Sequence, residues 1–379
     1  MIYLDNAATT KMYRECLDVY EKYACDIYYN PSALYSQSII AGDVVKKARE
    51  NIAKRLGCLP SEIYFTASGS EGDNMAFMST IKQKKGKILI SSVEHAAVHN
   101  MAHHLEEMGF EVVEVSVDRF GRVNEADFRA KMTKDVIFCS IMHVCNETGA
   151  VNPIKDLVKI AKEVNPRCIF HSDGVQAFGK SYINLKNLGV DVYTISSHKV
   201  HGPKGVGAIY IKESVHPKTF IYGGGQENNV RSATENVPGI AAFSKAIDIK
   251  YSTLDDDKDM AMHVFQHIYS FLSYIDGCII NTENSYEVAT SCIISFALSN
   301  VRGEGIVHAL ESKDVIIGTG SACSAKKGLK RIPLALGLSS EYFNGMLRIS
   351  FDPKISEEEL INALRELKLA IDKERKLVR

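Results

Sequence analysis

Residues 167–211 read RCIFHSDGVQAFGKSYINLKNLGVDVYTISSHKVHGPKGVGAIYI, and this stretch decides the predicted fold. It contains three short apolar and β-branched runs, at 167–170, 192–195 and 207–211, which are typical of buried strands. Similar runs precede it at 62–65, 87–90, 111–115 and 136–140, and amphipathic helical patterns separate them at 44–56, 70–82, 98–108 and 154–163. This alternation predicts an α/β domain whose mostly parallel sheet is covered by helices on both faces.

Composition excludes several classes of protein. The chain has 379 residues, with 45 lysines and arginines against 46 aspartates and glutamates, so it offers no electrostatic reason to bind nucleic acid or a membrane surface. Its nine cysteines are odd in number and include no Cys-x-x-Cys pair, so they indicate neither a zinc site nor a disulfide framework. Free thiols and the lack of a long apolar run predict a cytoplasmic protein without a membrane segment.

Two polar side chains stand at the ends of separate predicted strands. Lys199 follows the 192–195 run among histidines, where loss of hydration would lower the pKa of its amine and make it nucleophilic toward an aldehyde. Asp173 ends the strand before it, where it could keep a pyridine nitrogen protonated, as pyridoxal 5'-phosphate (PLP) requires. A surface lysine and a helix N-cap would explain each residue alone, but the two together favour a PLP site.

A strand, a small-residue turn and a helix follow one another at 62–82. The backbone amides of Gly69 and Ser70 would open this helix and point at an anion such as the cofactor phosphate. The signal is weak by itself, because such turns are common and this one lacks both glycine-rich phosphate-binding spacings.

His95 lies at the entry to the next predicted helix, a position that suits a ring stacked on a cofactor. His95, His99 and His103 recur at intervals of four residues, which also invites a metal interpretation. One straight helix aims at most two of them at one ion, and the sequence shows no cysteine or carboxylate that completes a set. We therefore expect no metal site and interpret His99 and His103 as surface residues.

With these residues in place, the chain resembles the PLP-dependent cysteine desulfurases of the NifS/IscS type, within the class V aminotransferase family. The resemblance extends over nearly the whole chain, with its motifs in the family's order. They are Tyr3-Leu-Asp-Asn-Ala-Ala-Thr-Thr10, Asn30-Pro-Ser32, Val93-Glu-His-Ala-Ala-Val98, Ser140-Ile-Met-His-Val-Cys-Asn-Glu-Thr-Gly149, His198-Lys-Val-His-Gly-Pro-Lys-Gly205, Gly223-Gly-Gly-Gln-Glu227, Thr319-Gly-Ser-Ala-Cys-Ser324 and Met346-Leu-Arg-Ile-Ser350.

The resemblance implies the PLP-dependent transferase fold of the aspartate aminotransferase type (fold type I). We expect a large PLP-binding domain with a mostly parallel sheet at 12–254, and a small α+β domain with the catalytic cysteine loop at 1–11 and 255–379. The sequence texture does change after about residue 251, with strands predicted at 291–296 and 346–351. A capping box at Ser356 and Glu359 then opens a last amphipathic helix.

The resemblance also assigns roles to individual residues. Lys199 would carry the cofactor covalently, Asp173 would pair with its ring nitrogen, Gln176 would bond its ring hydroxyl, and His95 would stack on the ring and relay protons. The phosphate would be bound by Ser70, Ser196 and His198 together with Thr234 of a neighbouring subunit, while Asn146 and Arg348 would hold the substrate carboxylate and Asn146 would also contact the cofactor.

Cys323 would be the nucleophile that takes sulfur from L-cysteine as a persulfide, leaving L-alanine. Its small neighbours suit a loop that moves, and the lysines at 326, 327 and 330 favour the thiolate. We expect the other eight cysteines to be inert.

The expected partners are L-cysteine, a second copy of the chain in a homodimer, and a sulfur-acceptor protein such as an iron–sulfur scaffold or a thiolation enzyme. A selenocysteine lyase, another class V PLP enzyme and a non-catalytic scaffold of a sulfur relay stay open as alternatives. Three positions depart from the family pattern, namely Tyr35, Ala233 and Cys145, and bear on substrate preference and partners rather than on the central residues.

Overall fold

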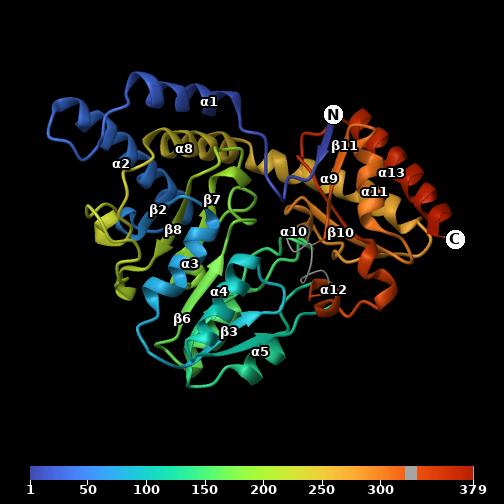
Figure 1. The fold of residues 1–379 in the computed structure, drawn as a ribbon, viewed down its shortest axis with the longest axis horizontal. Coiled ribbons are helices and arrows are strands. Elements are labelled where there is room, and N and C mark those ends of the chain that lie inside the picture. The colour runs from blue at the N-terminus through green and yellow to red at the C-terminus, as the bar shows by residue number, and fades with distance from the viewer. Residues whose placement is uncertain (321–330, 379) are drawn as a thin grey trace.

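The computed structural model describes residues 1–320 and 331–378, and its strands form two sheets in separate halves of the molecule (Figure 1). The seven-stranded sheet has the order β2 (Ile63–Thr66), β8 (Gly207–Ile211), β7 (Val192–Ser196), β6 (Ile169–Asp173), β5 (Val136–Ser140), β3 (Lys87–Ser91) and β4 (Glu111–Val115). The strand β8 is antiparallel to both of its neighbours, β2 and β7, and the other neighbouring strands of this sheet pair in parallel. The predicted mostly parallel sheet is therefore confirmed.

Helices cover both faces of this sheet, as the alternation of its side chains requires. Ile88 and Ile90 of β3 pack in one cluster with residues of α3 (Gly69–Thr80) and α4 (Ala96–Glu107). Leu89, which lies between them, packs in the cluster on the opposite face with α2 (Ser36–Leu56), α6 (Ile154–Val164) and α8 (Val237–Ser252). Successive strand residues point to opposite faces, so a strand buried on both sides reads as one continuous apolar run.

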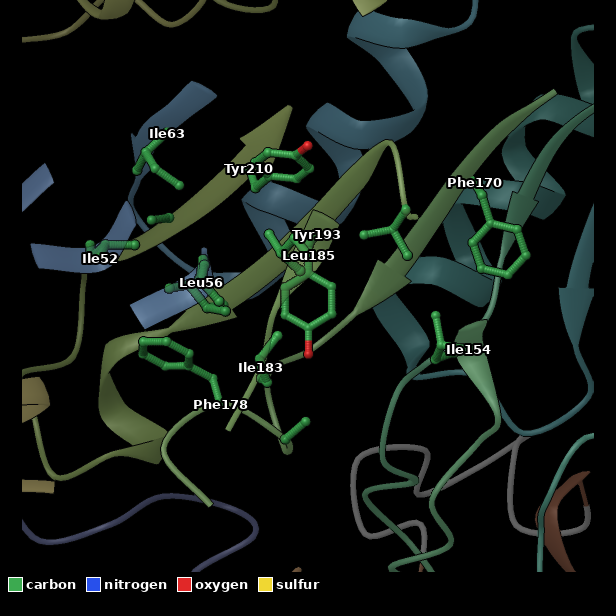
Figure 2. Packing of buried hydrophobic residues seen from close by; sticks show 14 of the residues in the cluster. Ile52, Leu56, Ile63, Ile154, Phe170, Phe178, Ile183, Leu185, Tyr193 and Tyr210 are labelled. Atoms are coloured by element: carbon green, nitrogen blue, oxygen red, sulfur yellow. The ribbon is translucent and has the colours of Figure 1, made fainter. Parts of the chain in front are cut away.

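Figure 2 shows part of the second cluster, where aromatic strand residues meet aliphatic helix residues. Phe170, Tyr193 and Tyr210 come from three adjacent strands, and Ile52 and Leu56 come from α2. The helix α2 ends at Gly57, whose left-handed conformation (φ 68°) makes it the C-cap.

The five-stranded sheet has the order β1 (Ile2–Leu4), β11 (Val315–Thr319), β12 (Met346–Ser350), β10 (Ile293–Leu298) and β9 (Cys278–Ile280). The N-terminal strand β1 pairs in parallel with β11, so that Ile2 lies opposite Val315 (Figure 1). We did not predict β1, β9 or β11. The first two have only three residues each, too few for a side-chain pattern, and β11 runs directly into a glycine-containing segment. The domain boundary at residue 254 stays a prediction.

The remaining helices connect these strands or cover the smaller sheet. They are α1 (Arg14–Glu21), α5 (Glu125–Lys131), α7 (Leu185–Leu188), α9 (Leu254–Ser273), α10 (Tyr286–Ala289), α11 (Gly303–Glu311), α12 (Arg331–Ala335) and α13 (Glu357–Val378). The last begins with the predicted capping box, since the amide of Glu359 donates to Ser356 Oγ at 3.2 Å and the amide of Ser356 donates to the Glu359 carboxylate at 3.3 Å. No helix in the described part of the chain is both long and apolar enough to cross a membrane.

A sharp turn follows β6 at the carboxyl edge of the large sheet. The strand ends at Asp173, three residues beyond the apolar run at 167–170, and Gly174 then turns the chain against the ring of Tyr193 in β7. The side chain of Tyr193 is fully buried, and its hydroxyl lies 2.7 Å from Nδ1 of His143.

Substituting Gly174→Ala would force a methyl group into the ring carbons Cε1 and Cζ of Tyr193, which has no room to withdraw. We expect the free energy of unfolding, measured by urea titration, to fall by about 1–3 kcal/mol. The matched control is Gly42→Ala in α2, where the nearest atom to a new methyl group is the carbonyl oxygen of Pro31 at 3.9 Å. That variant should keep or gain stability, and equal losses in the two variants would contradict the prediction.

Candidate active site

A cavity of about 380 Å³ opens where the carboxyl ends of the large sheet meet the small sheet. It is lined by ten of the predicted residues: Gly69, Ser70, His95, Asn146, Asp173, Gln176, Ser196, His198, Lys199 and Arg348. Two predicted residues are not among them. Thr234 is exposed and does not line the cavity, and Cys323 lies outside the described residues.

Lys199 lies in the short 3-10 turn that follows β7. Its amine donates hydrogen bonds to the carbonyl oxygens of Ala7 and Ala8, at 2.5 and 2.6 Å. Burial lowers the pKa of this amine to about 8, and the charges of Arg348 and Lys180 act in the same direction. A much larger fraction of Lys199 than of an ordinary lysine is therefore uncharged, and so nucleophilic, near neutral pH.

Asp173 is the last residue of β6, and its buried carboxylate accepts a hydrogen bond of 2.9 Å from the amide of Val175. Burial raises its pKa, while His95, the Val175 amide and Lys199 oppose that rise. A buried carboxylate with little internal compensation is suited to pair with a cationic partner such as a protonated ring nitrogen.

Gln176 is held from two sides. Its Nε2 donates to the carbonyl oxygen of Ala7 at 2.9 Å, and its Oε1 accepts from the amine of Lys180 at 3.0 Å. Lys180 also donates to the carbonyl oxygen of Ser291 at 2.9 Å, and burial lowers its pKa to about 8. Lys180 was not predicted as a site residue, although its position four residues after Gln176 was an available signal.

The helix α3 begins at the cavity, and its N-cap Ser68 accepts a hydrogen bond from the amide of Glu71 at 3.1 Å. A methyl group on Gly69 would lie 2.9 Å from Val175 Cγ2 and 3.4 Å from Ser196 Cβ, so only glycine lets the helix start approach the strand ends this closely. The buried hydroxyl of Ser196 has no hydrogen-bond partner among the described residues. An unpaired buried hydroxyl beside a helix N-terminus fits a phosphate group.

His95 is the N-cap of α4, and its Nδ1 accepts a hydrogen bond of 3.2 Å from the amide of Ala97. This contact makes Nδ1 the acceptor and leaves Nε2 to carry the ring proton. A ring nitrogen of His95 and one carboxylate oxygen each of Asp73 and Asp173 all lie within 4.8 Å of one another. The imidazole of His95 therefore lies in the same part of the cavity as the carboxylate of Asp173.

Arg348 enters the cavity from β12 and is buried. Its guanidinium donates to the carbonyl oxygen of Asn146 at 2.8 Å and forms ion pairs with Asp5 at 3.0 Å and Glu147 at 3.5 Å. These carboxylates raise its pKa against the effect of burial, so it stays a cation. Its Nε is buried and has no hydrogen-bond partner among the described residues.

Two buried acids in the cavity wall escaped the sequence analysis. Burial raises the pKa of Asp73 well above its usual range, and the neighbouring charge of Asp173 raises it further. Burial also raises the pKa of Glu94 to about 8, although its Oε1 accepts hydrogen bonds from Ser91 and from the amide of Met142. Their sequence signal was faint, since Asp73 lies within a predicted helix two residues after Glu71, and Glu94 stands beside His95 in a short motif.

The described cysteines are free thiols and none of them lines the cavity: Cys16, Cys25, Cys58, Cys139, Cys145, Cys168, Cys278 and Cys292. Burial raises the pKa of six of these, which keeps them protonated and unreactive: Cys16, Cys58, Cys139, Cys145, Cys278 and Cys292.

Comparisons with known proteins identify the family of this chain. The sequence pattern of the family described as "Aminotransferase class-V" matches residues 2–363. The chain belongs to the class V aminotransferase family. Enzymes of this family depend on PLP, and the unpaired Ser196 hydroxyl, the buried Asp173 and the Lys199 amine with its lowered pKa fit that cofactor.

Individual relatives are similar over nearly the whole chain. A NifS/IcsS protein homolog of Lactobacillus delbrueckii subsp. bulgaricus is 38% identical over 95% of this chain and 94% of its own length. The cysteine desulfurase IscS of Dictyoglomus turgidum is 36% identical over 98% of this chain and 95% of its own length. A solved NifS-like protein superposes with a TM-score of 0.91 at 32% identity, covering 98% of this chain and 99% of that one. The predicted family, fold, PLP dependence and cysteine desulfurase activity are confirmed.

The lowered pKa of Lys199 predicts how the cofactor-free protein takes up PLP. Only the uncharged amine attacks an aldehyde, so the uptake rate should rise with pH through a midpoint near 8, where half of Lys199 is uncharged. The measurement is the initial rate of the visible absorbance change on mixing with PLP at each pH. Free Nα-acetyl-lysine is the control and should show a midpoint near about 10. The same midpoint for protein and free lysine would contradict the assignment.

Proposed function

We propose that different residues of this chain carry out substrate binding, proton transfer and sulfur transfer in the reaction of a cysteine desulfurase, which converts L-cysteine to L-alanine. The observation that carries the proposal is the convergence of Lys199, Asp173 and Arg348 on one cavity from both sheets. A related protein, SspA, which is 29% identical with a TM-score of 0.79, has been solved in complex with cysteine. This supports L-cysteine as the ligand of the corresponding cavity here.

Arg348 binds the substrate carboxylate, with Asn146 beside it. The arginine is held by the Asn146 carbonyl oxygen at 2.8 Å and by Asp5 at 3.0 Å, so its side chain is oriented before substrate arrives. A planar guanidinium that is already fixed loses little conformational freedom when it pairs with a carboxylate. This pairing sets the direction of the substrate's Cα–H and Cβ–S bonds in the cavity.

Lys199 removes the Cα proton of the substrate. Bound PLP supplies an electron-withdrawing ring that takes up the charge left behind, and Asp173 keeps the nitrogen of that ring protonated. The Lys199 amine suits this role, because an amine whose pKa is about 8 is both partly uncharged and basic near neutral pH. His95, whose ring proton is on Nε2, acts together with Lys199 and passes protons within the cavity.

Cys323 receives the sulfur. Its thiolate attacks the substrate sulfur, an S–S bond forms as the Cβ–S bond breaks, and Cys323 becomes a persulfide while the three-carbon fragment takes up protons and leaves as L-alanine. The outer sulfur atom of this persulfide then passes to an acceptor protein, either an iron–sulfur scaffold or a thiolation enzyme. Support comes by elimination within the described chain, where none of the eight cysteines lines the cavity.

Changing Cys323→Ala should leave PLP bound, with its visible absorbance intact, and lower sulfide release in the presence of a thiol reductant by more than about 100-fold. The readouts are methylene-blue sulfide determination and intact mass after exposure to L-cysteine, which should show one added sulfur in the parent protein only. The control is Cys25→Ala, because Cys25 is exposed and lies outside the cavity lining. Sulfide release from Cys323→Ala at the parent rate would refute the role.

Thr234 completes the phosphate site of a second copy of the chain in a homodimer. It is exposed in the single chain and lies outside the cavity lining, as a residue that serves a partner's cavity must be. Residues 28–40 also expose five large apolar side chains: Tyr28, Leu34, Tyr35, Ile39 and Ile40. A cluster of this kind is typical of a surface that another protein chain covers.

Mixing two defective variants tests this arrangement. Subunits with Lys199→Ala and subunits with Thr234→Val should form mixed dimers in which one cavity has both native residues, so about a quarter of the parental sites should work at limiting PLP. Each variant alone should retain less activity under the same conditions. If Thr234 acted within its own subunit, mixing would restore nothing, and that outcome would contradict the proposal.

A further inference from the structure

Helix α4 and strand β4 bring three metal-ligating side chains together outside the cofactor cavity. His99 and His103 lie one turn apart on α4, and Glu114 lies beside them on β4, the edge strand of the large sheet. One ligand atom from each residue lies within 4.8 Å of the others. The sequence showed no carboxylate near this histidine pair, because Glu114 comes from the adjacent strand rather than from the helix itself.

The distances among the three atoms match the edges of a metal coordination tetrahedron. The two Nε2 atoms are 3.2 Å apart, and Glu114 Oε1 lies 3.4 Å from Nε2 of His99 and 3.7 Å from Nε2 of His103. Tetrahedral zinc, with bonds of about 2.0–2.2 Å to nitrogen and oxygen, separates its ligands by about 3.4 Å. One ion therefore fits against all three atoms with shifts of a few tenths of an ångström.

The other ring nitrogens are occupied in the way that metal-bound histidines require. Nδ1 of His103 lies 2.5 Å from a carboxylate oxygen of Glu106, and Nδ1 of His99 lies 3.4 Å from the side-chain oxygen of Asn100. Both partners accept hydrogen bonds, so each Nδ1 carries the hydrogen and each neutral ring turns the lone pair of its Nε2 toward Glu114. A carboxylate behind a ligating histidine strengthens and orients the ligand.

Charge and exposure also favour a cation. The carboxylates of Glu106 and Glu114 lie beside the two rings and bring negative charge to them. The side chains of His103 and Glu114 are 40% and 39% exposed, so solvent reaches the point they share.

We propose that His99, His103 and Glu114 form a binding site for zinc or a similar late first-row divalent cation, with water in the fourth position. Two imidazoles and one carboxylate are a ligand set that suits zinc, and three protein ligands leave one position open. Without a cation, the lone pairs of the two Nε2 atoms and of Glu114 Oε1 would face one another. One ring nitrogen would then have to take up an extra proton to offset their repulsion.

Zinc binding to the cofactor-loaded protein tests the proposal. The protein is first treated with N-ethylmaleimide, so that its nine cysteines do not compete, and is then dialysed to equilibrium against zinc chloride. The parent protein should bind one more equivalent of zinc than the double variant His99→Ala/His103→Ala. The matched control is His263→Ala/His267→Ala on α9, whose rings are 4.5 Å apart but belong to no three-residue cluster among the described residues. That variant should bind zinc like the parent.

Two single variants keep the test valid if the double variant folds poorly. Glu114→Gln keeps the shape of the side chain, and Glu106→Gln removes only the carboxylate behind His103, so each should weaken zinc binding by about 10–100-fold without a change in circular dichroism. X-ray absorption at the zinc edge should show imidazole nitrogen and oxygen ligands at about 2.0–2.2 Å.

Equal zinc stoichiometry in the parent and in the double variant would overturn the proposal. So would unchanged affinity in Glu114→Gln, because the carboxylate would then contribute nothing. A zinc-edge spectrum without imidazole scattering would overturn it as well, since the bound metal would then lie elsewhere on the protein.

Discussion

The hydrogen bonds from the Lys199 amine to the carbonyl oxygens of Ala7 and Ala8 are the constraint on which the rest of the site depends. Lys199 belongs to the carboxyl edge of the large sheet, whereas Ala7 and Ala8 follow the strand that pairs in the small sheet. An amine removed from water must find acceptors, so this contact brings the two sheet ends together at one point. Gln176 strengthens the same junction, because its amide also donates to Ala7.

The cavity is organised around a balance of buried charge. Burial and the charges of Arg348 and Lys180 lower the pKa of Lys199, while Asp5 and Glu147 form ion pairs with the arginine. The cavity therefore favours ligands that bring negative charge to Arg348 and to the N-terminus of α3. A phosphorylated cofactor and an amino-acid carboxylate meet those two requirements at separate ends of one cavity.

The sequence predicted those features whose signal is local. Asp173 and Lys199 could be recognised because each closely follows an apolar run. The strands of the large sheet could be recognised because they are buried on both faces and therefore read as continuous apolar runs. Features that arise from contacts between distant segments were missed. The pairing of β1 with β11, the contact of Lys180 with Ser291 and the approach of Glu114 to two histidines all depend on how elements pack, which no single segment encodes.

Parallel pairing of β1 with β11 also constrains when the protein can complete its fold. Ile2 pairs with Val315, so the first strand has no native partner until the ribosome has added roughly 300 more residues, which takes tens of seconds at typical rates of synthesis. During that interval the large sheet can form, but the carbonyl groups that receive the Lys199 amine are not yet fixed. A cavity that includes Ala7 and Ala8 is therefore complete only late in the synthesis of the chain, after the strands of the large sheet have been made.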